Sequence, residues 1–303
     1  MEEEAEEKLF KAGGAVASAL KYALEAVNAG VNITELCEEL ESIIKREGAF
    51  PAFPANISVN EVAAHYTGIP GEEAVIPEGG VIKVDLGAHI DGYIADGALT
   101  ISLDKKYVPL LKAAYRALKA AQRALRHGIR LGQVGLVIER EIKSLGFNPI
   151  SNLTGHKIER YNLHAGKSVP NVATVISRKA SEGEVYAVEP FSTDGVGMVV
   201  EGRPGGIFRV VSTKRTKNDV LDNMLRDLWR EYKSLPFAAR WVFASRGSEG
   251  LNVLKELEAR GRVYQYSVLV ERTGGMVAQF EDTFIVRRNN ATPLIGVLEI
   301  VKL

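Results

Sequence analysis

The sequence contains a single cysteine, Cys37, among its 303 residues. One thiol cannot form an intrachain disulfide, and it cannot build a thiolate zinc cluster. Cys37 lies in a segment with the apolar spacing of a helix, where a small buried side chain is a better interpretation than a nucleophile. Thiol catalysis and thiolate metal binding are therefore set aside as the basis of function.

An excess of charge of either sign is also absent, because 38 basic residues balance 38 acidic ones. A protein without net charge is not expected to be a general binder of nucleic acid or of acidic membranes. The chain has no apolar run of the ~18 residues that a membrane-spanning helix needs. Its first residues are acidic, which is the reverse of the basic start of a signal peptide. We therefore expect a cytoplasmic protein.

The composition that remains, 46% hydrophobic and 25% charged, is that of an ordinary soluble globular protein. Apolar residues recur at helical spacing near the N-terminus and again after residue 107, with β-branched and aromatic strand patterns between them. Helices are expected over 2–28, 32–47, 107–127 and 134–145. Two helices, an apolar hairpin and two further helices suggest an internal structural repeat.

Two aspartates interrupt the hairpin formed by the strand patterns 81–86 and 93–101. With a turn centred near 90–91, Asp85 and Asp96 lie directly opposite each other, with Cβ atoms ~4.5–5.5 Å apart. Two carboxylates at that separation repel each other unless a proton or a cation lies between them. The hairpin therefore predicts a metal site.

Two further acids lie inside apolar strand patterns, Glu189 before a proline and Glu281 between hydrophobic residues. His156 follows a glycine in the second half of the chain. Four carboxylates and one imidazole suit Mn, Fe, Co or Zn, and their charge is enough to neutralise two such ions. Two ions ~3.5–4 Å apart that share a water are a known device for hydrolysis.

Five separated segments resemble, in the right order, the type II methionine aminopeptidases, and specifically their short archaeal-type members. These segments are 53–65, 84–96, 155–164, 188–191 and 279–283. The resemblance covers nearly the whole chain and implies an α/β (α+β) pita-bread fold, a curved antiparallel sheet with outer helices. It implies one catalytic domain over 1–303, with a helical insertion subdomain at 213–262.

The resemblance also implies a role for individual residues. The metal ligands would be Asp85, Asp96, His156, Glu189 and Glu281. Asp96 and Glu281 would bridge the two ions, and Glu189 would also move a proton. His65 and His164 would be catalytic and bind substrate just outside the metals. Phe53, Leu163 and Tyr266 would form the wall of a methionine slot, although plain core packing is an alternative for these three.

The implied reaction is removal of the initiator methionine from nascent proteins and peptides, with a preference for a small second residue. Two divalent ions (Co, Mn, Fe or Zn) would activate the water. Nascent polypeptide N-termini are the expected partners, the ribosome is a further candidate, and neither a membrane nor a specific nucleic acid is expected. We expect a monomer.

Two alternatives remain open from the residues alone. One is an X-prolyl peptidase, although those enzymes usually carry a substantial additional N-terminal domain. The other is a non-catalytic relative that binds RNA or ribosomes through basic residues of the insertion, Lys214, Arg215 and Lys217. Such relatives usually lack metal ligands.

Overall fold

Antiparallel strands form the centre of the protein, whose computed structural model describes residues 2–175 and 178–303. Within these ranges the strands fall into four hydrogen-bonded groups. The first holds β1 (Phe50–Pro51), β2 (Asn56–Val59), β4 (Val81–Ile90) and β5 (Tyr93–Ser102). The second holds β6 (Asn148–Pro149), β10 (Phe191–Thr193) and β14 (Val277–Gln279). The third holds β3 (Val62–Ala64), β11 (Val199–Val210), β12 (Phe237–Ala238) and β13 (Val263–Glu271). The fourth holds β7 (Thr154–Ile158), β8 (Ser168–Pro170), β9 (Val185–Val188), β15 (Asp282–Val286) and β16 (Ala291–Pro293).

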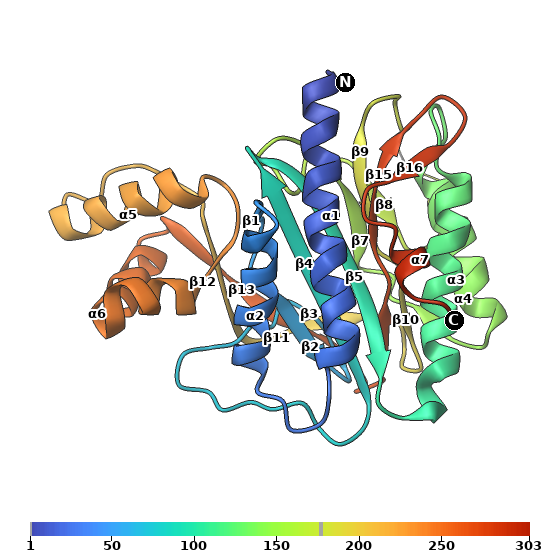
Figure 1. Cartoon of the computed structure of the whole chain (residues 1–303), viewed down its shortest axis with the longest axis horizontal. Coiled ribbons are helices and arrows are strands. Elements are labelled where there is room, and N and C mark those ends of the chain that lie inside the picture. Colours follow the sequence, from blue (N-terminus) through green and yellow to red (C-terminus); the bar gives the residue numbers. More distant parts are fainter. Residues whose placement is uncertain (1, 176–177) are drawn as a thin grey trace.

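Helices cover the outside of these strands (Figure 1). α1 (Glu3–Ala26) packs along β4 and β5, with α2 (Ile33–Arg46) beside it. After a short 3-10 turn, η1 (Lys105–Tyr107), α3 (Val108–Ala124) packs against α4 (Leu131–Ser144). A last short helix, α7 (Val297–Ile300), contacts α1. The expected pita-bread architecture, a curved antiparallel sheet with outer helices, is confirmed.

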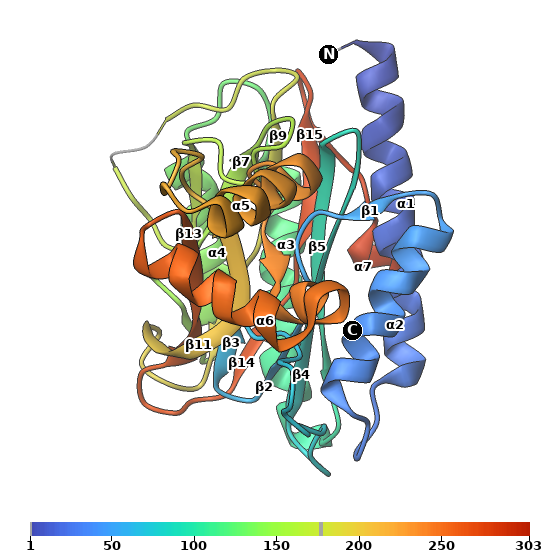
Figure 2. The same ribbon diagram turned by 90° about the vertical axis from the view of Figure 1, so that its left-hand side faces the viewer.

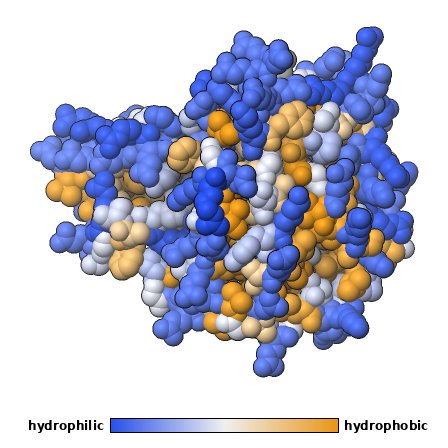
Figure 3. Space-filling model, in the orientation of Figure 1, coloured by the Kyte–Doolittle hydropathy of each residue, from blue (hydrophilic) through white to orange (hydrophobic). Residues whose placement is uncertain are grey.

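Local sequence explains where the first two helices lie. α1 turns a stripe that includes Leu9, Val16 and Leu20 into the core, where all three are buried. The Asn32 side chain begins α2 by accepting hydrogen bonds from the backbone N–H groups of the second and third residues after it, at 2.8 and 3.1 Å. None of the helices in the described ranges is long and apolar enough to span a membrane. Figure 3 shows mainly hydrophilic side chains on the face that carries α1.

The hairpin of β4 and β5 has a register different from the expected one. Its two-residue turn is at 91–92, where both residues have positive φ, of 51° and 83°. As a result Asp85 pairs with Ala98 and Asp96 pairs with Gly87. The prediction that the two aspartates are directly opposite is wrong. They are diagonal neighbours on one face of the hairpin, a separation of roughly 7–8 Å, which leaves more room between the carboxylates.

Two helices, α5 (Asp219–Tyr232) and α6 (Ala239–Ala259), lie between β11 and β13, in the segment expected to be a helical insertion. They project to one side of the molecule (Figures 1 and 2). Residues such as Leu225, Phe237 and Leu257 form a hydrophobic cluster here that is separate from the main core. The segment therefore has packing of its own beside the curved sheet.

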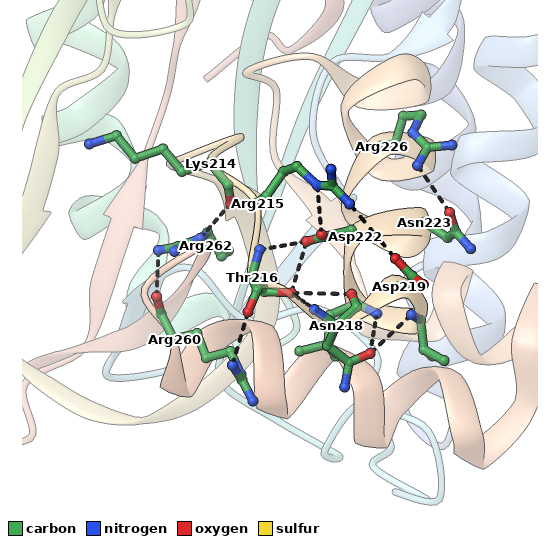
Figure 4. Close-up of polar contacts among 12 residues, drawn as sticks. Lys214, Arg215, Thr216, Asn218, Asp219, Asp222, Asn223, Arg226, Arg260 and Arg262 are labelled. Atoms are coloured by element: carbon green, nitrogen blue, oxygen red, sulfur yellow. Dashed lines mark hydrogen bonds and ion pairs between the residues drawn. The ribbon is translucent and has the colours of Figure 1, made fainter.

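A polar network fixes the loop that leads into α5 (Figure 4). Asp222 Oδ1 accepts hydrogen bonds from the backbone N and the Oγ1 of Thr216, at 2.6 and 2.8 Å. Asp222 Oδ2 accepts one from Arg215 Nε at 3.2 Å. Arg215, one of the three basic residues of the RNA-binding alternative, thus has an acidic partner within its own segment.

Candidate metal centre

The residues that the sequence predicted as a site line one cavity on the sheet. The lining consists of Phe53, Asn56, Ala64, His65, Asp85, Asp96, His156, Leu163, His164, Glu189, Ile207, Pro236, Tyr266 and Glu281. All ten predicted ligands, catalytic residues and wall residues are in this set, although they come from segments spread over more than 200 residues. Asn56, Ala64, Ile207 and Pro236 were not predicted.

Strand geometry directs the two hairpin aspartates into this cavity. Along residues 81–88 of β4 every residue is buried except Asp85, which is partly exposed. Gly87 lies two positions along on the same face, and a side chain there would collide with the Phe53 ring, since its Cβ would be 2.2 Å from Cε1. Gly87 therefore lets the ring lie against the strand beside the carboxylates.

The other two acids lie at strand ends, so the expectation that each acid lies within a strand is wrong for them. β9 ends at Val188, immediately before Glu189, because the proline that follows cannot donate to a ladder. Glu281 lies between β14 and β15 and forms an isolated bridge with Ala98 of β5. Its backbone N donates to the Ala98 carbonyl at 2.9 Å. This bridge brings Glu281 beside Asp96.

Ligand-type atoms converge at the centre of the cavity. Asp96, His156 and Glu281, all buried, each present one such atom within 4.8 Å of the others. His156 Nε2 lies 3.5 Å from Asp96 Oδ2 and 3.7 Å from Glu189 Oε1. Among the described residues, Asp85 Oδ1, Asp96 Oδ1 and Glu281 Oε1 are buried and have no hydrogen-bond partner. A cation is the ligand that would satisfy these oxygens.

Electrostatics agree with that interpretation. Burial raises the pKa of Asp85 to about 7. Burial and the neighbouring carboxylates raise the pKa values of Asp96, Glu189 and Glu281 well above their usual range. Burial lowers the pKa of His156 to about 3, so its imidazole is neutral and can be a ligand. Without a metal, the negative charges of these carboxylates repel one another, and a divalent cation between them would remove that repulsion. The residues present therefore fit a divalent metal.

Neighbouring side chains for which no role was predicted hold these groups in place. Thr283 Oγ1 accepts a hydrogen bond from Asp96 N and donates one to Asp96 O, both at 2.7 Å. Gln279 Nε2 donates to Glu281 Oε2 at 2.8 Å, which leaves the other carboxylate oxygen of Glu281 free. Such outer contacts fix the orientation of a ligand.

The adjacent acids Glu281 and Asp282 have different surroundings. Asp282 accepts hydrogen bonds from three consecutive backbone N–H groups at 295–297, between 2.9 and 3.1 Å, at the start of α7. Because neighbouring residues in an extended chain point to opposite sides, only Glu281 reaches the cavity. Asp282 is therefore an anchor for the C-terminal segment and not a ligand candidate.

The two predicted catalytic histidines lie at the cavity on different segments. His65 has a φ of 67°, which is uncommon for a residue with a side chain, and its ring centroid is 5.2 Å from that of Tyr266. Burial lowers the pKa of His65 to about 4. The ring centroids of His164 and His156 are 4.3 Å apart. Both predicted histidines are thus next to the proposed ligands or the proposed wall.

The predicted wall residues lie at the boundary between the hydrophobic core and the cavity. Phe53 and Leu163 belong to the main hydrophobic core and also line the cavity. Tyr266 on β13 is the register partner of Ile207 on β11, which lines the cavity as well. The cavity therefore has an apolar side next to its carboxylate side. Unlike an acid in an apolar strand, Ile207 and Pro236 carry no local anomaly by which the sequence could have identified them.

Comparisons with known proteins place these features in a family. A family model described as metallopeptidase family M24 matches residues 7–288. A methionine aminopeptidase of Pyrococcus horikoshii is 44% identical over 288 residues, which cover 94% of this chain and 98% of that protein. Among solved structures, a thermophilic Arx1 superposes with a TM-score of 0.87 at 18% identity, and the match covers 100% of this chain and 94% of that one. That likeness concerns the fold alone.

A methionine aminopeptidase from Thermotoga maritima superposes with a TM-score of 0.71 at 25% identity, covering 97% of this chain and 98% of that one. The family model and the Pyrococcus relative both extend over the segments that hold the cavity residues. On these grounds the chain belongs to metallopeptidase family M24 and, within it, to the methionine aminopeptidases, which are metal-dependent hydrolases.

Proposed function

We propose that this enzyme removes the N-terminal methionine of nascent proteins and peptides with a water activated at a centre of two divalent ions. The five ligands would be Asp85, Asp96, His156, Glu189 and Glu281, all of which line the cavity. The observation that carries this proposal is the convergence of Asp96, Glu281 and His156 in a cavity that Asp85 and Glu189 also line, with carboxylate oxygens that lack partners among the described residues. A total of four negative charges would balance two divalent cations.

The ions would lower the pKa of a bound water and polarise the scissile carbonyl. The residues of the chain would perform the remaining tasks. Glu189, whose carboxylate is near His156, would accept the proton of the water and pass it to the leaving amine. His65 and His164 would hydrogen-bond the peptide group on either side of the reacting carbon. His65 is suited to this role because a neutral imidazole offers both a donor and an acceptor.

The apolar side of the cavity would select methionine. Phe53, Leu163 and Tyr266 offer an aliphatic and two aromatic surfaces, which favour an unbranched thioether. We further propose that the second residue of the substrate must be small. The two imidazoles and Pro236 share the cavity with the carboxylates and leave little space beside them.

The enzyme would act as a monomer in the cytoplasm, where nascent chains carry their initiator methionine. Support for a monomer is that one chain supplies all five proposed ligands and both histidines. Ion identity remains a choice among Co, Mn, Fe and Zn, because carboxylate and imidazole ligands accept each of them.

The experiment that tests the function uses metal-stripped protein and two peptides, one starting Met-Gly and one starting Ala-Pro. Each is incubated with the protein during titration with Mn, Fe, Co or Zn. Release of methionine alone, restored by metal, is the expected result. Cleavage only before proline would assign the protein to the X-prolyl peptidases, and no cleavage with any metal would favour a non-catalytic binding protein.

A further inference from the structure

A buried ion pair joins the helical insertion to the N-terminal helices. Arg240, in the first turn of α6, donates through Nη2 to Glu41 Oε1 on α2, and each side chain is only 4% exposed. Trp241 Nε1 donates to the other oxygen of Glu41 at 2.8 Å. Burying two charges costs free energy unless further hydrogen bonds offset the loss of water. The other hydrogen bonds of Glu41 and Arg240 therefore show which part of the protein this ion pair positions.

The network converges on the backbone of Ala55. Ala55 N donates to Glu41 Oε1 at 2.9 Å. The Ala55 carbonyl accepts a hydrogen bond from Thr67 Oγ1 at 2.7 Å, and Thr67 Oγ1 in turn accepts one from Arg240 Nη1 at 2.8 Å. Cys37 Sγ donates to the same carbonyl at 3.3 Å. Glu41 thus binds the Ala55 N–H directly, and Arg240 binds the Ala55 carbonyl through the Thr67 hydroxyl.

Ala55 lies between two residues of the cavity wall, Phe53 and Asn56. Residues 53–55 lie outside the regular strands, because β1 ends at Pro51 and β2 begins at Asn56. The Pro54 nitrogen has no hydrogen to donate. Contacts to Glu41 and Thr67 therefore replace a strand ladder as the means of fixing this part of the wall.

The insertion also contacts a second segment of the cavity wall. Ser234 Oγ, in the connection that follows α5, donates a hydrogen bond to the Tyr161 carbonyl, two residues before Leu163. Leu235 packs into the main core, and Pro236 lines the cavity itself. The insertion is consequently connected to the segments that carry Phe53 and Leu163, two of the three residues proposed to contact methionine.

We propose that Arg240 and Glu41 are positioning residues through which the insertion sets the shape of the methionine slot, without contacting the substrate. The inference deepens the proposed function and rests on it. Its consequence is that loss of the pair changes discrimination among substrate side chains, while the metal ligands and the fold are retained.

The test compares two double variants with the wild-type enzyme. In E41M/R240M both charges and the acceptor for Ala55 N are removed together, which avoids leaving one buried charge alone. In E41Q/R240M the glutamine Oε1 can still accept from Ala55 N. A matched control is R246M, which breaks an exposed ion pair of the same insertion, between Arg246 and Asp227 at 2.7 Å.

The readouts are kcat and KM for Met-Gly and Leu-Gly peptides, bound metal per chain, and hydrogen exchange at Ala55 N. For E41M/R240M we expect a Met over Leu preference lowered by about tenfold or more, carried mainly by KM, since small misplacements of a binding surface are costly. Metal content should be unchanged and exchange at Ala55 N faster. E41Q/R240M, which loses the Arg240 contact to Thr67 but keeps an acceptor for Ala55 N, should lose a smaller part of the preference, and R246M none of it.

An unchanged Met over Leu preference in folded E41M/R240M would overturn the inference. If that variant fails to fold, R240K is used in its place. Lysine keeps the positive charge but lacks the planar guanidinium that contacts Glu41 and Thr67 at the same time. A reduced preference in R240K supports the inference and a wild-type preference overturns it. Failure of the wild-type enzyme to release methionine would contradict the proposed function instead, which separates the two outcomes.

Discussion

At the cavity, individual carboxylate side chains are buried with oxygens that lack hydrogen-bond partners among the described residues, an arrangement that a cation would stabilise. Asp96 is the clearest example, because Thr283 fixes its backbone on both sides while Oδ1 has no partner among the residues described. Burial and the Asp85 charge raise the pKa of Asp96 well above its usual range. The residue therefore costs stability in the metal-free protein and is retained for its chemistry.

Asp96→Asn should abolish methionine release without unfolding the protein. The amide has nearly the shape of the carboxylate but lacks the negative charge with which Asp96 would hold a divalent ion. We expect a loss in kcat/KM of more than about 100-fold, since even outer partners of metal ligands contribute ~10–100-fold. Thermal unfolding of the metal-free variant should occur at or above the wild-type temperature, because a repulsion has been removed. Full activity of the variant would contradict the dinuclear centre.

His164→Ala should lower turnover and leave the metal content unchanged, because His164 is proposed to contact the substrate and not the ions. A loss of ~10²–10⁴ in kcat is expected for a group that assists proton transfer or charge stabilisation. Metal analysis of the purified variant, beside a peptide assay, checks both parts. Loss of metal in this variant would mean that His164 is itself a ligand.

At the scale of elements, strand register decides which side chains share the cavity. Apolar strand patterns made Asp85, Asp96, Glu189 and Glu281 recognisable in the sequence, because an acid is costly there. The sequence did not give their relative positions. The two-residue turn displaced the aspartates from direct opposition to a diagonal, and the two glutamates were placed by a proline and by an isolated bridge to β5.

Gly87→Ala should damage the methionine slot from within β4. Its methyl group would lie 2.2 Å from the Phe53 ring, so the ring must move. We expect a higher KM for methionine peptides and a loss of ~1–3 kcal/mol in the free energy of unfolding, typical of overpacking. Gly79→Ala is the control, because an added methyl group there meets no described atom within 4 Å. Equal behaviour of the two variants would contradict the proposed position of Phe53.

Glu184, next to β9, should make the free energy of unfolding depend on pH in the acid range. Burial disfavours its charge, but hydrogen bonds from Lys167, Tyr186 and Ser181 outweigh that effect and lower the pKa of Glu184 to about 2. A folded pKa below the unfolded value means that this stabilisation is complete above about pH 4.5 and is lost as the pH falls toward 2. In urea titrations across this range, Glu184→Gln should show a shallower loss of stability than wild type. Identical pH dependence would exclude the contribution.

At the scale of the whole molecule, the cavity joins parts of the chain that have no other reason to meet. Strands β4 and β5 supply two of the proposed ligands, and the segments around β7, β9 and β15 supply the rest. Helix patterns, the family and the residues that share the cavity could be predicted from the sequence. Glu41 and Arg240 could not, because an acid and a base on helices look like solvated residues until the insertion packs against α2.

A centre built from both halves of the chain should also stabilise the fold when it is filled. A ligand that binds only the folded state adds RT ln(1 + [L]/Kd), about 2.7 kcal/mol at a concentration of 100 Kd. Because protons compete for the raised-pKa carboxylates, metal affinity should fall as the pH falls below about 7, the pKa of Asp85 in the metal-free protein. Thermal unfolding with and without Mn, at pH 6 and pH 8, measures both effects. An unfolding temperature that is independent of metal at both pH values would contradict this coupling.

The central claim is that two ions held by five residues perform the hydrolysis. Its most direct test is a titration of metal-stripped enzyme with Mn in which bound ions per chain and methionine release from a Met-Gly peptide are measured in the same samples. The account predicts tight binding of two ions per wild-type chain, with full activity at two, and weaker binding with no activity in Asp96→Asn. Full activity at one ion per chain, or release of methionine without any ion, would contradict it.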